Sequence, residues 1–368
     1  MTIPALLTRR APATQRARRG GGVARRREAA AGWLFSAPAV ILLIVFLVVP
    51  IVMAAWVSLS DWGGIGSPFS AGVKSVGLAN YKALLTEPGL PQLDLAQSLR
   101  DNVYYVVLVV PAQTALALSL AILVSRRALR GRGFFRTAFY FPSVTSSVAV
   151  SIVFLFLFAD AGVVNGLVGA LGAHGPNWFS DPDGLLHLIL RGLGVTRAPG
   201  LLAAHGFLGM SWWDWLAGPS VAMMVLIILA IWTTAGTFML LFLPALYSIS
   251  GDIEEAAIVD GAGGWTRLWR ITLPLIRPAL FLVLTLGLIA TWEVFDQVFL
   301  ISQGNPAETT LTPAYLAYQV SFSNQQWGQG AAIAFILFAI IIVLTVLQRL
   351  VLRERTAGAG LVSRWRQR

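Results

Sequence analysis

Cysteine is absent from this 368-residue chain, and charged residues are scarce. Without cysteine there can be no disulfide, no thiolate metal site and no cysteine nucleophile, although the redox compartment stays open. Asp, Glu, Lys and Arg make up only 12% of the residues, whereas an ordinary soluble domain carries about 25%. A water-soluble fold of this length could not cover its surface with so few charges. Lipid must therefore face much of the chain, 57% of which is hydrophobic.

Lysine is nearly missing as well, since Lys74 and Lys82 are the only lysines among the 27 basic residues. A nucleotide-binding P-loop has the sequence G-x-x-x-x-G-K-[ST], and neither lysine follows a glycine. ATP hydrolysis by this chain is therefore excluded, and any such energy must come from another subunit. The arginines stand in clusters beside apolar stretches and form no single basic face. The net charge of +10 therefore indicates membrane topology rather than a nucleic-acid partner.

The apolar residues gather in six segments long enough to span a membrane, since a spanning helix needs about 20 mostly apolar residues. The sequence thus predicts an all-α membrane protein with six transmembrane helices between basic tails at residues 1–32 and 353–368. The first apolar run is too long for the core of a typical signal peptide. The predicted spans are Trp33–Ser58, Val103–Val124, Thr137–Phe158, Ser220–Leu243, Ala279–Ile301 and Ala331–Leu352.

The basic residues orient these spans. With the N-terminus in the cytoplasm, 22 of the 27 basic residues lie on the inner side, so both termini are predicted to be cytoplasmic. On the outer side, residues 61–102 predict one short helix around Asn80–Leu85. Residues 159–219 form a long excursion, in which Trp212, Trp213 and Trp215 are interpreted as membrane-interface anchors. Residues 302–330 hold an aromatic, amide-rich stretch from Tyr315 to Trp327.

The most informative segment is the predicted cytoplasmic loop 249–278. Ser250 or Asp252 can cap a first short helix, and acidic residues, Glu255 among them, follow in its first turn, where the helix dipole favours negative charge. Gly261 and the glycines after it predict a turn, because glycine accepts a positive φ without steric cost.

A second short helix follows in this loop, and its sequence places four side chains on one face. Pro274 and Pro278 are predicted to end it and to lead into the fifth span. A connector with two predicted helices and a defined turn is either a docking element for a cytoplasmic partner or a helix pair that merely lies on the membrane. The residues of the shared face are Trp265, Leu268, Trp269 and Thr272.

The same loop resembles the EAA loop of ABC importer permeases. The family pattern is Glu-Ala-Ala, three residues, Gly, nine residues, Ile, one residue and Leu-Pro, and every spacing is met here. In that family the loop folds into coupling helices that insert into a groove on the ATPase subunit. The matching positions are Glu255, Ala256, Ala257, Gly261, Ile271, Leu273 and Pro274.

The resemblance extends over most of the chain. Val76–Tyr81 is similar to the family's V-G-L-x-N-Y, and Phe295-Asp296 followed by Gly304-Asn305-Pro306 resembles its F-D…T-x-G-G-P. Together these features resemble the carbohydrate-uptake subgroup. One departure is the outer loop after Trp178, which is longer than usual and makes about Gly184–Pro219 an insert.

This resemblance implies a six-helix permease in the bacterial inner membrane, paired with a second, homologous permease. Two cytoplasmic ATPase subunits would bind ATP and Mg²⁺ and dock at the loop, and an external solute-binding protein would deliver a sugar, oligosaccharide or polyol. A glycerol-phosphate-type or other small polar solute is the alternative. No cofactor, metal or catalytic residue is expected in the chain itself.

Glu293 and Asp296 are the only acidic residues within the predicted spans, three positions apart and therefore on one face of the predicted fifth helix. Intramembrane carboxylates are costly and usually face a bundle interior or an aqueous cavity. One interpretation is a polar wall of the solute path, with Trp292, Phe295 and Gln297 beside it. The alternative is that Asp296 is simply solvated near the outer interface or bonds a neighbouring helix.

Two other classes of protein stay open. An ATPase-independent secondary transporter could use these carboxylates as a proton relay, but no Lys or Arg lies deep in a span to complete one. A membrane-embedded enzyme would need a polar catalytic cluster at bilayer depth, and only this pair of carboxylates offers one.

Overall fold

The computed structural model describes residues 21–125, 130–195 and 197–352. The chain divides into two compact units after Trp56, and each is described by itself. The first is a helical rod in which α1 (Gly21–Leu43) continues through the π-helix η1 (Ile44–Val48) into α2 (Val49–Ser58). Its apolar side chains are largely exposed, so the rod has no core of its own and is suited to lipid or to another chain.

The second unit is built on four long helices, α4 (Leu90–Ser125), α11 (Val221–Tyr247), α15 (Arg277–Trp292) and α17 (Trp327–Leu352). The α4–α11 contact is the most extensive. Along α4 the buried residues recur every three or four positions, which gives the helix one face for packing. The Oγ of Ser220 accepts a hydrogen bond from the Met223 amide at 3.1 Å and so caps α11 at its first turn.

The third predicted span is bent. It consists of α5 (Arg132–Val144) and α6 (Ser147–Leu157), which meet at 94°. Between them Thr145 and Ser146 are extended, which ends one helix and begins the next. The α5 backbone lies close to α11 at Gly236, where an added Cβ would overlap the carbonyl oxygen of Phe139. A glycine is therefore needed for this approach.

The fifth predicted span is interrupted, and the expectation that Glu293 and Asp296 share one face of a continuous helix is wrong. Helix α15 ends at Trp292, a turn follows, and the π-helix η3 (Val298–Ser302) continues the chain. The turn holds Glu293, Asp296 and Gln297, but the apolar residues on both sides keep the average hydropathy of the whole segment high. An average taken over a segment of span length therefore does not reveal the break.

The second span begins earlier than predicted. The short helix α3 (Ala79–Leu85) lies where the sequence predicts it, but α4 starts at Leu90, well before Val103. The additional turns carry polar side chains that are buried by other parts of the chain, such as Ser98 and Asn102. Hydropathy detects helices that face lipid, because these helices are apolar. It does not detect helical turns whose polar side chains are buried by protein.

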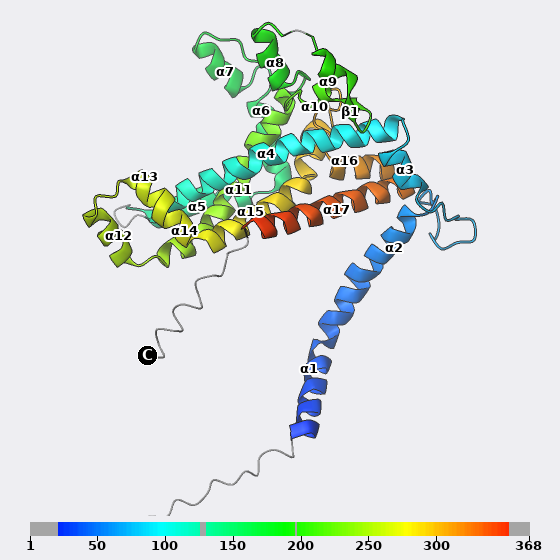
Figure 1. The fold of residues 1–368 in the computed structure, drawn as a ribbon, viewed down its shortest axis with the longest axis horizontal. Coiled ribbons are helices and arrows are strands. Elements are labelled where there is room, and N and C mark those ends of the chain that lie inside the picture. The colour runs from blue at the N-terminus through cyan, green and yellow to red at the C-terminus, as the bar shows by residue number, and fades with distance from the viewer. Residues whose placement is uncertain (1–20, 126–129, 196, 353–368) are drawn as a thin grey trace, which may run out of the picture. The chain divides into compact units, whose positions relative to one another are not determined.

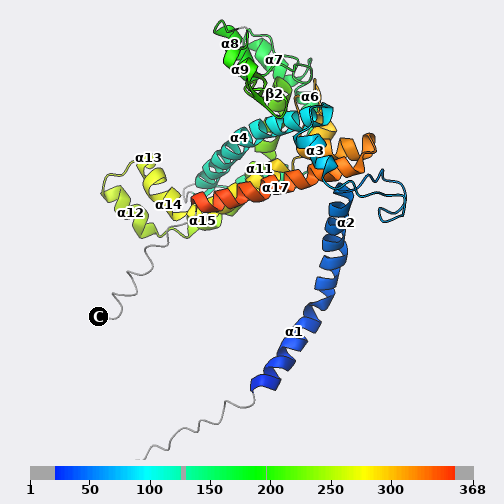
Figure 2. The same cartoon turned by 45° about the vertical axis from the view of Figure 1, so that its right-hand side comes forward.

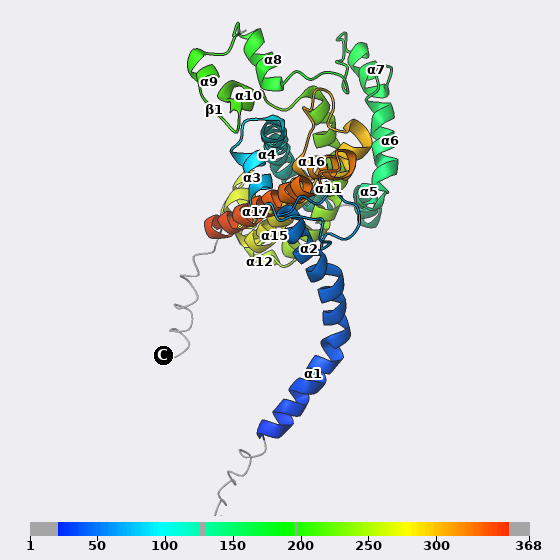
Figure 3. The same cartoon turned by 90° about the vertical axis from the view of Figure 1, so that its right-hand side faces the viewer.

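Figures 1 and 2 show α12 and α13 at one end of the bundle and α3 and α16 at the other, with α7 to α10 grouped on one side. Figure 3 shows α17 and α15 side by side, consistent with their contacts. The remaining elements are α7 (Val163–Ala170), α8 (Leu185–Gly192), α9 (Gly200–Ala204), β1 (Gly206–Phe207), β2 (Met210–Ser211), α10 (Trp212–Trp215), α12 (Gly251–Val259), α13 (Gly264–Arg267), η2 (Leu268–Thr272), α14 (Leu273–Leu275), α16 (Pro313–Tyr318) and η4 (Gln319–Ser323).

In the described part of the chain, four helices are long and apolar enough to cross a membrane, and six spans result if each bent pair counts as one. The second bent pair joins the helical segment 264–275 to α15 at 79°. The prediction of an all-helical, multi-span fold is therefore confirmed. The cytoplasmic placement of both termini stays a prediction.

Candidate functional site

The turn that interrupts the fifth span lines a polar cavity. The cavity has a volume of about 250 Å³ and lies between α4, α11 and the turn that follows α15. Its polar walls come from all three elements, which are far apart in the sequence. They include Gln113, Thr234, Thr291, Glu293, Asp296 and Gln297.

A second cavity, of about 500 Å³, lies on the other side of the same turn, toward α5 and α6. It shares Thr234, Glu293, Asp296 and Gln297 with the first and adds hydroxyl groups such as that of Ser143. The turn therefore presents two carboxylates to both spaces. Neither carboxylate forms an ion pair with any residue that the structure describes.

Gln113 supplies a polar group that the sequence analysis did not select. It is 1% exposed, and its Oε1 accepts a hydrogen bond from the Thr234 hydroxyl at 2.6 Å. Its Nε2 has no partner among the described residues. An added Cβ at Gly287 would crowd this nitrogen, so the small residue on α15 makes room for the amide. A glutamine within an otherwise apolar span was the sequence signal for this position.

The predicted pathway residues separate into two groups. Glu293, Phe295, Asp296 and Gln297 line the first cavity, and all except Phe295 also line the second. Trp292 does not line either of these cavities, because it is 5% exposed and packs in an apolar cluster between α4 and α17. The position three before Phe295 thus points into the core, as the turn changes the direction of the chain.

The EAA-like loop has the two-helix form that its sequence predicts. Ser250 is the N-cap of α12, and its Oγ accepts a hydrogen bond from the Asp252 amide at 3.3 Å. At the other end Gly261 has φ +77°, and the amides of Gly261 and Ala262 donate to the carbonyls of Ile258 and Ala257. This is a Schellman cap. The spacing from Ala256 and Ala257 to Gly261 therefore corresponds to the last turn of α12 and the left-handed residue that ends it.

Most of this loop has little cover from the described chain. On α12, Ala257 is buried, whereas Glu255 and Ala256 are exposed and Val259 is 87% exposed. Trp265 is 73% exposed, and its ring lies 5.6 Å from that of Trp269. A small-residue helix with exposed apolar neighbours is the surface expected of an element that docks to another protein.

The second half of the loop is tied to the bundle. Leu273 packs on the apolar cluster that also holds Ile276, which is 1% exposed. Ile271 is half-buried, and Pro274 is exposed within the short helix α14. The helical segment does not end at Pro274, as the sequence predicts, but at Leu275.

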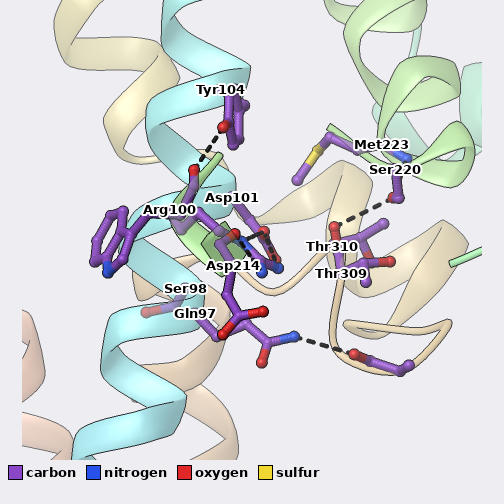
Figure 4. Close-up of polar contacts among 12 residues, drawn as sticks. Gln97, Ser98, Arg100, Asp101, Tyr104, Asp214, Ser220, Met223, Thr309 and Thr310 are labelled. Atoms are coloured by element: carbon purple, nitrogen blue, oxygen red, sulfur yellow. Dashed lines mark hydrogen bonds and ion pairs between the residues drawn. The ribbon is translucent and has the colours of Figure 1, made fainter. Parts of the chain in front are cut away.

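The N-terminal half of α4 carries a second group of polar residues, shown in Figure 4: Gln97, Arg100, Asp101 and Tyr104 with their partners. This group is called the outer junction here, because the sequence predicts it on the outer side of the membrane. Arg100 and Asp101 form an ion pair at 2.7 Å, with side chains only 10% and 3% exposed. Arg100 also donates to the Asp214 carbonyl at 3.4 Å, and Tyr104 donates to the Trp215 carbonyl at 2.6 Å.

The outer junction also reaches the loop after η3. Gln97 donates to the Ala307 carbonyl at 3.0 Å, and Ser220 donates to the Thr309 carbonyl at 3.3 Å. In the same region the Thr312 hydroxyl donates to the Val294 carbonyl at 3.0 Å, within the turn that follows α15. The outer junction therefore fixes several segments of the chain to α4.

Two of the three tryptophans in the outer insert (about Gly184–Pro219, predicted on the outer side) contact other residues of the insert. Trp215 donates its Nε1 hydrogen to the Phe207 carbonyl at 3.1 Å, and Trp213 stacks on His187 with ring centres 4.4 Å apart. Trp212 is 44% exposed. The structure thus gives two of the three predicted interface anchors partners in the insert.

Comparison with known proteins bears on these features. Residues 113–356 match the family described as "Binding-protein-dependent transport system inner membrane component". The lactose transport system permease protein LacF of Rhizobium radiobacter is 31% identical, over 84% of this chain and 90% of its own. The multiple sugar-binding transport system permease protein MsmF of Streptococcus mutans is 28% identical over 82% and 88%. The sn-glycerol-3-phosphate permease protein UgpA of Agrobacterium fabrum is 30% identical over 74% and 79%.

Solved structures show the same fold. A chain of a bacterial ABC transporter that imports the acidic polysaccharide alginate superposes with a TM-score of 0.66 at 20% identity, covering 90% of this chain and 99% of its own. A chain of the alginate transporter in complex with an alginate pentasaccharide-bound periplasmic protein gives a TM-score of 0.64, with 90% and 96% covered.

Proposed function

Because the chain belongs to the family of binding-protein-dependent transport system inner membrane components, we propose that it forms half of the translocation pathway of an ABC importer for a neutral sugar, oligosaccharide or polyol. The family consists of transport permeases rather than enzymes, and sugar permeases are among the relatives. The other half would come from a second, homologous permease in the same inner membrane. A solute-binding protein outside and two ATPase subunits inside would complete the assembly.

The EAA-like loop is proposed as the site of ATPase docking. The exposed Glu255, Ala256 and Val259 would meet the ATPase, and Gly261 would set the angle between the two helices of the loop. Motion of the loop would reach the pathway, because segment 264–275 meets α15 at Ile276 and α15 leads into the turn at Glu293. ATP binding would then draw the loops together and open the cavity outward, and hydrolysis would reset it.

The composition of the cavity walls supports a neutral solute. The observation that carries this proposal is the pair of free carboxylates, Glu293 and Asp296, in walls that contain no Lys or Arg in the described chain. Carboxylates accept hydrogen bonds from hydroxyl groups, and amides both donate hydrogen bonds to hydroxyl groups and accept them. The two carboxylates repel an anion, most strongly where water is partly excluded. The glycerol-phosphate alternative is therefore disfavoured, although a relative carries that solute in its name.

The test is ATP-driven uptake into proteoliposomes that hold both permeases and the ATPases. The solute and the solute-binding protein are outside the vesicles, and ATP is inside. Lactose, maltotriose and glycerol serve as neutral probes, and sn-glycerol 3-phosphate as the anion. We expect uptake of a neutral probe that needs both ATP and the binding protein. Equal uptake without ATP would establish the secondary-transporter alternative instead, and preference for the anion would contradict the proposed solute class.

The same assay tests the two carboxylates. The double variant Glu293→Gln, Asp296→Asn should take up the neutral probe about tenfold more slowly, because hydrogen bonds to charged acceptors are about twice as strong as those between neutral groups. Asp160→Asn, in an outer segment away from both cavities, is the control and should transport normally. Equal rates for the double variant and the control would remove Glu293 and Asp296 from the pathway.

A further inference from the structure

An unusual row of aromatic rings leads away from the cavity. Phe295, which lines the cavity, stacks on Phe299 with ring centres 5.4 Å apart. Phe299 meets Tyr318 edge-on at 5.4 Å, and Tyr318 stacks on Phe322 at 4.9 Å. Phe322 meets Trp327 at 4.5 Å. The row therefore links η3, α16, η4 and the start of α17 without a gap.

The row is not simply part of the core. Phe295, Phe299, Tyr318 and Trp327 are each half-buried, and Phe322 is 58% exposed. Tyr315 is the buried ring behind the row, with its centre 6.2 Å from those of both Phe295 and Tyr318. Core packing thus holds the rings from one side and leaves part of each accessible from the other.

Polar side chains accompany the exposed end. Asn324, Gln325 and Gln326 begin two positions after Phe322 and are exposed, and Gln319, next to Tyr318 in the sequence, is half-buried. Tyr318 contributes a hydroxyl group to the row itself. The row therefore combines apolar faces with amide and hydroxyl groups.

Two wider helical turns carry rings of the row. Phe299 lies in the π-helix η3 and Phe322 in the π-helix η4, which are two of the four π-helices in the described chain. A π-helical turn redirects a side chain and occurs often at functional sites. The helices η3 and η4 thus supply two separate parts of one row.

We propose that this row, Phe295–Phe299–Tyr318–Phe322–Trp327, is a carbohydrate-binding track along which a sugar passes from the outer end of the chain to the cavity at Glu293. The inference rests on the proposed function. A sugar ring presents a patch of C–H groups that carry a slight positive charge, and the face of an aromatic ring is negative. Stacking satisfies this patch while the amides beside the row bind the hydroxyls. Several weak sites in a line allow a solute to move on from each.

The test uses the complete transporter in proteoliposomes with its solute-binding protein, and whichever of lactose and maltotriose the wild type takes up faster. Phe299→Leu and Phe322→Leu each keep apolar bulk and remove the ring. Each should lower kcat/KM for uptake by about three- to tenfold, the range expected for loss of one aromatic pairing. Phe322→Tyr retains the ring and should restore uptake to near the wild-type value.

The matched control is Phe338→Leu on α17. Phe338 is 57% exposed, close to the 58% of Phe322, and pairs with Phe335 rather than with the row. It should transport as the wild type does. Normal uptake in both Phe299→Leu and Phe322→Leu would overturn the track. A loss in Phe338→Leu or in Phe322→Tyr equal to that in Phe322→Leu would overturn it as well. If the wild type takes up glycerol but neither sugar with ATP, the track is overturned while the proposed function stands. If it takes up none of the three neutral probes with ATP, the proposed function fails and the track fails with it.

Discussion

The two ends of the second unit differ in how far the chain covers its own side chains. At the outer junction, Arg100 and Asp101 are almost buried, and Gln97 and Tyr104 donate to carbonyls of the same chain. In the EAA-like loop, by contrast, Val259 and Trp265 are exposed to 87% and 73%. The chain itself thus covers the outer junction. The exposed apolar surface of the loop supports the proposal that a partner covers it, since such surface is unfavourable in water.

This contrast predicts different consequences of substitution. A change at the outer junction should act on the stability of the fold. A change in the loop should leave the fold intact and act on coupling to the ATPase.

The largest effect is expected at Gly261, whose φ of +77° is strained for any other residue. In Gly261→Val the Schellman cap of α12 should be lost and the second helix of the loop reoriented. We expect ATP-driven uptake to be abolished, with the amount of protein in the membrane unchanged. Gly263→Val is the matched control, because Gly263 is equally open but has φ −64°, which valine adopts readily.

Uptake measured beside membrane abundance separates the two explanations for the loop. If Gly261→Val transports normally, the loop is a helix pair that lies on the membrane surface rather than a docking element. If Gly263→Val also loses all uptake, the loop tolerates no bulk at all, and the positive φ is not the cause.

The next largest effect is expected at Arg100. Arg100→Met leaves the Asp101 carboxylate buried without its cation, which typically costs about 3–5 kcal/mol of unfolding free energy. The readout is the Tm of the purified transporter. Adding Asp101→Leu removes the unpaired charge and should recover most of the loss. If the single variant melts at the wild-type Tm, the outer junction does not stabilise the fold.

A second ion pair in the chain serves as control for this prediction. Arg191 and Asp183 are 2.9 Å apart but 54% and 42% exposed. Exposed pairs contribute about 0–1 kcal/mol. Arg191→Met should therefore leave the Tm nearly unchanged. A fall in Tm equal to that of Arg100→Met would contradict the claim that burial makes the loss of Arg100 costly.

Hydropathy and motif spacing predicted the helical multi-span fold, and for a physical reason. Lipid-facing helices must be apolar, and the loop's Glu255-to-Gly261 spacing reflects a local helix end with its cap. The features that the sequence did not reveal depend on tertiary contacts. The early start of α4 at Leu90 and the meeting of Gln113 with Thr234 require protein neighbours that no local pattern encodes. The break after Trp292 lies in a segment that is apolar on average, and the three-residue spacing of Glu293 and Asp296 also fits one face of a helix, so neither hydropathy nor spacing indicates the break.

The smallest effect is expected from the outer insert, whose ends meet. Gly184 pairs with Ser220 in an isolated bridge, and the Leu185 amide donates to the Pro219 carbonyl at 3.0 Å. A chain lacking residues 185–219 can therefore join Gly184 to Ser220 without stretching. The Arg100–Asp101 pair lies on α4 and stays intact. Arg100 loses its bond to the Asp214 carbonyl and Tyr104 its bond to the Trp215 carbonyl, at a cost of about 1 kcal/mol each. The Tm should thus fall less than in Arg100→Met, and uptake should persist, because no residue of 185–219 lines either cavity. A deletion variant that melts below Arg100→Met would place the insert among the elements that hold the outer end together.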